Sequence, residues 1–136
     1  MTPTTTDAGP VTLVIPPVAS MVRVGRLTAS SIASLADMNV DDIDDIKIAV
    51  SEMITVLIQS GNRTAITLRF ETTADAFSVE ASTPSGSTNL GRNDLALATA
   101  VLEAVADEHH IASTDDRILL RIVKQLTSQA TSAASA

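Results

Sequence analysis

Hydrophobic residues recur every three or four positions between Asp41 and Gly61, in the run DDIDDIKIAVSEMITVLIQSG. On a helix they form one broad apolar face made by Ile43, Ile46, Val50, Met53, Ile54 and Leu57. Glu52 lies almost opposite this face. Four aspartates crowd the first turn, where the partial positive charge of the helix dipole favours them, and Gly61 supplies a stop. The pattern predicts a central amphipathic helix with both ends marked.

A second stretch of helical periodicity runs from Val18 to Met38, and Asn39 separates it from the central helix. Its apolar arc consists of Val18, Met21, Val24, Leu27, Ile32, Leu35 and Ala36. The opposite face carries Arg23 and Arg26 among the small residues Ser30, Ala33 and Ser34. This face is predicted to be an accessible basic spot, and a solvated helix face with ordinary counter-charges is the alternative.

Strict alternation of apolar and polar residues predicts strands before and after these helices. Val11–Ile15 is short and β-branched, and two prolines end it. Ile66, Leu68 and Phe70 share one face of a strand over Thr64–Glu71, and Phe77–Ala81 repeats the alternation after a turn at Thr72–Asp75. One-sided alternation is typical of an antiparallel sheet with one covered and one solvated face.

The C-terminal third adds three further elements. Ser82–Asn93 is rich in Ser, Thr, Gly and Asn and is predicted to be the least ordered internal stretch. A third helix is predicted over Leu95–Glu108, then a weak strand over His109–Ser113 and a strong one over Arg117–Lys124. The predicted fold is therefore α+β: a two-layer sandwich whose mostly antiparallel sheet of four to five strands carries three helices on one face.

Composition limits the possible functions of this single domain. We expect a folded unit over residues 11–125 between disordered ends at 1–10 and 126–136. A net charge of −7 and an aromatic content of 1% argue against direct nucleic-acid binding. The chain has no cysteine, no apolar run that could span a membrane and no signal-like start, so we expect a cytoplasmic protein.

The central helix also carries a family resemblance. The run Ile46–Glu52, IKIAVSE, followed by Gly61, resembles the first nucleotide-binding helix of the bacterial anti-sigma-factor serine kinases. These are small relatives of the histidine-kinase ATPases with the Bergerat fold, and the predicted order of elements over residues 11–125 is similar to theirs. The resemblance implies that Glu52 stands at the position of a general base. Val56 stands where the family has the asparagine that holds the magnesium of ATP.

Two further nucleotide motifs of the family are altered here. The family's adenine-binding aspartate, in a D-x-G-x-G motif, is replaced by Ser82 or Thr83, and Ser85 also stands within the motif. The box that approaches phosphate reads Arg92-Asn93-Asp94-Leu95-Ala96-Leu97, where Asp94 would repel phosphate and Gly91 lies only nearby. Valine has no oxygen with which to ligate magnesium. We therefore expect ATP binding to be weakened or lost, and no cofactor.

The resemblance also implies partners. Arg26 falls where related anti-sigma factors carry an arginine that contacts protein partners, whereas Arg23 has no such match. The implied partners are a sigma factor, an anti-sigma antagonist with a phosphorylatable serine, and a second copy of the chain. The function that the resemblance implies is therefore that of an anti-sigma factor or related partner-switching regulator of transcription, which acts by protein binding rather than by phosphoryl transfer. One alternative is an active serine kinase that uses ATP and Mg²⁺ through substitute residues such as Gln59 or Thr55. Another is a non-catalytic scaffold domain.

Other residues offer little chemistry. His109 and His110 are adjacent in a predicted strand, so their side chains point to opposite faces and cannot easily share a metal ion. The aspartate cluster at the start of the central helix lacks the glycine and the spaced ligands of a calcium loop. The sequence has no elbow motif that would indicate a nucleophilic serine.

Overall fold

The computed structural model describes residues 9–59, 63–85, 92–114 and 116–126. Of helix residues 92–94 it describes the backbone alone. Gly61, Gly91, the side chain of Asp94 and most of the two ends predicted to be disordered lie outside the described residues.

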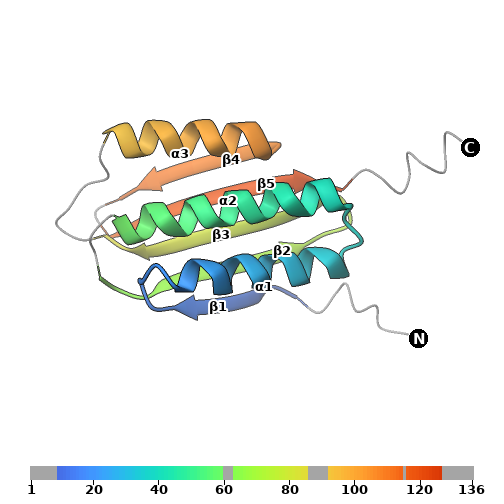
Figure 1. The fold of residues 1–136 in the computed structure, drawn as a ribbon, viewed down its shortest axis with the longest axis horizontal. Helices are drawn as coiled ribbons and strands as arrows, with labels where there is room; N and C mark the ends of the chain where they lie inside the picture. The colour runs from blue at the N-terminus through green and yellow to red at the C-terminus, as the bar shows by residue number, and fades with distance from the viewer. Residues whose placement is uncertain (1–8, 60–62, 86–91, 115, 127–136) are drawn as a thin grey trace, which may run out of the picture.

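The elements follow the predicted order. They are β1 (Val11–Ile15), α1 (Met21–Leu35), α2 (Val40–Gln59), β2 (Ile66–Thr72), β3 (Ala76–Pro84), α3 (Arg92–Val105), β4 (Glu108–Ser113) and β5 (Arg117–Gln125). Figure 1 shows two layers, with the three helices side by side over one face of the sheet and α2 between the other two. None of these helices is both long and apolar enough to cross a membrane, as far as the chain is described.

The five strands form one antiparallel sheet in the order β1-β2-β3-β5-β4. Its registers place apolar residues of neighbouring strands in rows, such as Leu68 beside Ala81 and Ala81 beside Leu120. These three residues are fully buried under the helices. The α+β fold with three helices on one face of an antiparallel sheet is therefore confirmed.

Helix α2 forms the centre of the core. Ile46, Val50, Met53, Ile54 and Leu57, which the periodicity places on its apolar face, are all buried. Asn39 begins the helix, because its side-chain oxygen accepts a hydrogen bond from the backbone N–H of Asp42 at 2.8 Å. The predicted helix is thus confirmed, with its start one residue earlier than predicted.

The predicted packing face of α1 is only partly correct: Met21, Ile32 and Ala36 pack against the core, but Val18, Val24, Leu27 and Leu35 are exposed. The helix packs on α2 through a stripe of small residues, Gly25, Ala29 and Ala33, all of them buried. Val24 and Leu27, assigned to the apolar arc, are 38% and 54% exposed instead. Small residues allow two helix backbones to approach closely, so here close packing selects the buried face rather than side-chain hydrophobicity. The helix is also shorter than predicted at both ends.

The predicted loop after Ala81 also needs correction. Ser82, Thr83 and Pro84 continue strand β3 and pair with Leu119, Ile118 and Arg117 of β5. The two hydroxyl groups are satisfied within the protein, because the Ser82 hydroxyl accepts a hydrogen bond from Arg117 and the Thr83 hydroxyl donates one to the backbone oxygen of Ala65. The third helix likewise begins earlier than predicted, at Arg92.

Candidate binding groove and nucleotide motifs

A groove of about 580 Å³ lies on the solvent side of α1 and α2. Arg26 of α1 lines it, and every other lining residue belongs to α2: Asp44, Lys47, Ile48, Ser51, Glu52 and Thr55. On α2 these residues recur every three or four positions, so they form one stripe on the face away from the core. The groove therefore brings together Arg26 and Glu52, the two residues singled out from the sequence.

The charges in the groove are mixed. Arg26 and Lys47 contribute positive charge, whereas Asp44 and Glu52 contribute negative charge. Lys47 lies 3.8 Å from Asp44 one turn away, a pair exposed enough to contribute little stability. Arg26 makes no ion pair within the described part of the chain, so its guanidinium is available to a carboxylate of another molecule.

The groove floor combines apolar and polar groups. Ile48 is 49% exposed although it lies in the middle of α2. The hydroxyl of Thr55 donates to the backbone oxygen of Ser51 at 2.7 Å. The Ser51 hydroxyl is itself buried and has no hydrogen-bond partner among the described residues. The groove therefore presents one exposed apolar side chain among polar and charged groups.

Val56 lies one turn after Glu52 on α2 but is buried in the core and does not line the groove. Asp45, Ala49, Glu52 and Val56 recur at intervals of four, three and four residues, which aligns them along the helix. Val56 is 1% exposed and belongs to the hydrophobic core. In the anti-sigma-factor serine kinases this position holds a metal-binding asparagine. Here it is a packed core position occupied by valine, whose side chain has no oxygen atom.

The residues at the adenine motif bond to the protein itself. Thr83 is 1% exposed, and its hydroxyl lies 3.1 Å from the backbone oxygen of Ala65. The Ser85 hydroxyl donates to the backbone oxygen of Thr114 at 3.0 Å. The Ser82 hydroxyl accepts from the Arg117 guanidinium at 2.7 Å. These hydroxyl groups connect neighbouring segments at one end of the sheet, which is a structural role.

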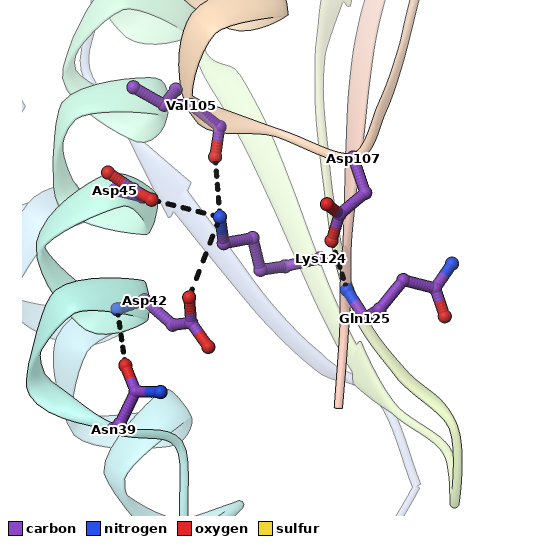
Figure 2. Close-up of polar contacts among 7 residues, drawn as sticks. All are labelled: Asn39, Asp42, Asp45, Val105, Asp107, Lys124 and Gln125. Atoms are coloured by element: carbon purple, nitrogen blue, oxygen red, sulfur yellow. Dashed lines mark hydrogen bonds and ion pairs between the residues drawn. The ribbon is translucent and has the colours of Figure 1, made fainter. Parts of the chain in front are cut away.

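A second polar cluster joins the sheet to two helices at the other end (Figure 2). The Lys124 amine reaches from β5 to Asp45 of α2 at 2.9 Å and to the backbone oxygen of Val105, the last residue of α3, at 3.0 Å. Asp42 lies 3.6 Å from the same amine. Asp107 accepts a hydrogen bond from the backbone N–H of Gln125 beside it. Lys124 therefore fixes α2 and α3 relative to the sheet.

Two opposing effects act on the pKa of Lys124. Partial burial lowers it, because desolvation penalises the charged form. The hydrogen bond and charge of Asp45, together with the charges of Asp42 and Asp107, outweigh this burial and raise the pKa above its ordinary value. Lys124 is not among the residues predicted from the sequence, although the alternation of β5 places it on the same face as the buried Leu120 and Ile122. A lysine at a strand position that faces the helices indicates a buried or partly buried charge that needs a partner, and this is how Lys124 could have been found from the sequence.

The remaining candidates are separated in the fold. His109 pairs with Ile122 on the helix side of the sheet, and His110 pairs with Arg121 on the open side. Gln59, a possible substitute in the kinase alternative, is exposed at the end of α2 and does not line the groove. Of the two substitutes considered, only Thr55 shares the groove with Glu52.

Comparison with known proteins shows a likeness in fold. No family model matches this chain, and no curated protein matches it. The structure is similar to that of the RsbU and RsbW domains of Rv1364c from Mycobacterium tuberculosis, with a TM-score of 0.69 and 17% sequence identity. The match covers 86% of this chain and 32% of the other, so the chain spans about a third of that structure. At this identity the likeness extends to the fold alone.

Proposed function

We propose that this chain is a partner-switching regulator of the anti-sigma type that acts by binding proteins. The observation that carries the proposal is the α1–α2 groove, where Arg26, the position of a partner contact in the resembling family, lies beside an exposed isoleucine. The fold likeness to the RsbW-containing structure and the IKIAVSE resemblance of α2 support it. The partners proposed on this basis are a sigma factor and an anti-sigma antagonist.

Nucleotide binding is not part of the proposed function. Val56 offers no oxygen to magnesium and packs in the core. The Thr83 hydroxyl is buried against backbone oxygens, where an adenine amine would need an accessible acceptor. ATP affinity in the micromolar range corresponds to roughly 8 kcal/mol of binding free energy, which these positions are poorly equipped to supply. The described residues therefore do not fit ATP with Mg²⁺.

One observation is also compatible with the alternative that the protein is an active serine kinase. Glu52 lines an open groove with Thr55, so a substrate hydroxyl from a partner could approach its carboxylate. In that alternative the antagonist would also bind in the α1–α2 groove. ATP would then bind through residues other than Val56. Phosphate transfer distinguishes the two functions, because protein binding alone requires none.

Calorimetric titration with the cognate sigma factor or antagonist tests the proposal. Arg26→Ala is expected to weaken the complex by about 2 kcal/mol, as truncation of an interface arginine often does. Arg23→Ala is the matched control, because Arg23 is an exposed arginine of the same helix that does not line the groove. Equal and negligible effects of both substitutions would place the binding surface elsewhere.

A further inference from the structure

A second hollow, of about 230 Å³, lies at the end of the molecule where α1 ends, and we call it the end pocket. Three segments line it: residues 35–37 at the end of α1, residues 72–74 at the end of β2 and in the turn to β3, and Leu126 after β5. Figure 1 shows the end of α1, the β2–β3 turn and the end of β5 together at the right of the view. The end pocket shares no residue with the α1–α2 groove.

Backbone hydrogen bonds fix the walls of the end pocket. The N–H of Leu126 donates to the backbone oxygen of Asp75 at 2.8 Å, which ties the end of β5 to the β2–β3 turn. On the side of α1, the N–H of Asp37 donates to the backbone oxygen of Ser34 at 3.2 Å. The pocket is therefore formed before any ligand arrives, as most ligand sites are.

Much of the lining is apolar. Leu35 is 78% exposed, the highest value among the exposed large hydrophobic residues of the described part of the chain. Leu126 is half-buried and packs against the core, and Ala36 and Ala74 complete the apolar lining. A single exposed leucine needs no explanation, but this one borders a hollow with a second leucine. The end pocket can therefore cover the aliphatic part of a ligand.

The charge of the end pocket is negative. Asp37 is its one charged lining residue, and the exposed carboxylate forms no ion pair within the described part of the chain. The last turn of α1 contains no basic residue. The partial negative charge at the C-terminal end of this helix therefore adds to that of Asp37. Because the whole chain also carries a net charge of −7, a cation is attracted here and an anion is repelled.

We propose that the end pocket binds a basic side chain, lysine or arginine, of a protein partner. Such a side chain combines an aliphatic stem, which Leu35 and Leu126 cover, with a cationic head, which pairs with the Asp37 carboxylate. The volume is below the roughly 300–1,000 Å³ of sites for drug-sized ligands, so it suits one side chain better than a cofactor. This site is independent of the function proposed for the α1–α2 groove.

NMR titration of the full chain with Nα-acetyl-lysine methylamide tests the site, because the blocked ends leave the side-chain amine as the ligand's charge. The backbone amide signals of residues 35–37 and 72–74 are expected to shift in a saturable way. Nα-acetyl-norleucine methylamide has the aliphatic stem without the charge, and methylammonium has the charge without the stem. Each analogue is expected to bind at least about threefold more weakly than the lysine derivative.

Two substitutions separate the apolar and the charged contributions. Asp37→Asn is expected to raise the dissociation constant of the lysine derivative about threefold. Asparagine tolerates the left-handed backbone of this position, where φ is 58°, so the change removes the charge without straining the chain. Leu35→Gln, at an exposed position, is expected to raise the dissociation constant by a similar factor of about three.

Asp116→Asn is the matched control. It removes the same charge next to the start of β5, and the register of β3 with β5 places that start at the other end of the sheet from the β2–β3 turn. The control is expected to keep the dissociation constant within about twofold of the wild-type value. The absence of saturable shifts at residues 35–37 and 72–74 would overturn the proposal. Equal binding of the norleucine derivative, or unchanged binding by Asp37→Asn, would overturn it as well. The titration contains no sigma factor or antagonist, so either result leaves the proposed function of the groove unaffected.

Discussion

Gly25 of α1 lies directly against Ile54 of α2. A Cβ atom built at position 25 would collide with the Cδ1 atom of Ile54 and would also touch Val50. The two helices therefore approach as closely as they do because residue 25 has no side chain. This contact sets the position of α1, and with it the position of Arg26 one residue further along the helix.

Gly25→Val is expected to destabilise the protein by about 2 kcal/mol, because overpacking a tight contact forces neighbouring groups to move. Urea unfolding measures the change in the free energy of unfolding. Ser31→Val is the matched control: it introduces the same side chain at an exposed position of α1 and should change stability by no more than roughly 0.5 kcal/mol. Similar losses in both variants would indicate that valine itself, rather than the contact with Ile54, is responsible.

The same contact explains why the sequence predicts α1 as a helix but not its orientation. Helical periodicity identifies Val24, Leu27 and Leu35 as one apolar face. The alternative stripe of Gly25, Ala29 and Ala33 has the same period and much lower hydrophobicity. Choosing between the two requires the distance between the helix axes, which is a property of the packed pair and not of either segment.

Single residues of the candidate site were predictable, whereas their arrangement was not. The resemblance of IKIAVSE indicates Glu52 and, by counting along the chain, Arg26. Their common groove depends on how α1 packs on α2, and the sequence does not show that Lys47 and Ile48 also line it. The sequence also offered no sign of the buried hydrogen bond of Thr83, because its acceptor, the backbone oxygen of Ala65, lies just before β2 and 18 positions away along the chain.

Lys124→Met is expected to destabilise the protein by about 1–2 kcal/mol at neutral pH, because it removes a partly buried amine that bonds to Asp45 and to a backbone oxygen. Urea unfolding of both proteins measures the difference. Lys47→Met is the control, since the pair that Lys47 forms with Asp44 is longer and more exposed and should contribute under about 0.5 kcal/mol.

The Lys124 contribution should also depend on pH in a defined direction. The pKa of this amine is raised in the folded state, so the folded protein holds the proton more tightly than the unfolded chain does. Its contribution is therefore fully present below the ordinary lysine pKa of about 10.4 and is lost as pH rises through the folded value. The stability gap between wild type and Lys124→Met should narrow at alkaline pH; a gap that grows there would contradict the assignment.

Val56→Asn tests whether a single substitution can restore a metal-binding position. The new amide would lie at a site that is 1% exposed, so we expect a loss of about 1–3 kcal/mol from burying an unsatisfied polar group. Ile48→Asn, at an exposed position of the same helix, should leave the free energy of unfolding nearly unchanged.

Thermal melting with and without Mg²⁺ and ATP should show no increase in midpoint for wild type or for Val56→Asn. An increase of several degrees in the wild-type protein would restore the kinase interpretation.

Substitution of Glu52 distinguishes a function in protein binding from one in phosphoryl transfer. If the groove acts only by binding, incubation of the wild-type protein with ATP, Mg²⁺ and the cognate antagonist should leave the antagonist's serine unmodified, and Glu52→Ala should give the same background. Intact mass spectrometry of the antagonist detects the addition of one phosphate group. Transfer by the wild type that Glu52→Ala abolishes would identify this carboxylate as a general base. Glu52→Gln then completes the comparison, since it removes the charge but keeps the size of the side chain and its ability to form hydrogen bonds. If this variant keeps its affinity for the partner but loses phosphate transfer, the charge of Glu52 acts in catalysis. If the variant binds the partner more weakly and neither protein transfers phosphate, the charge acts in the partner contact.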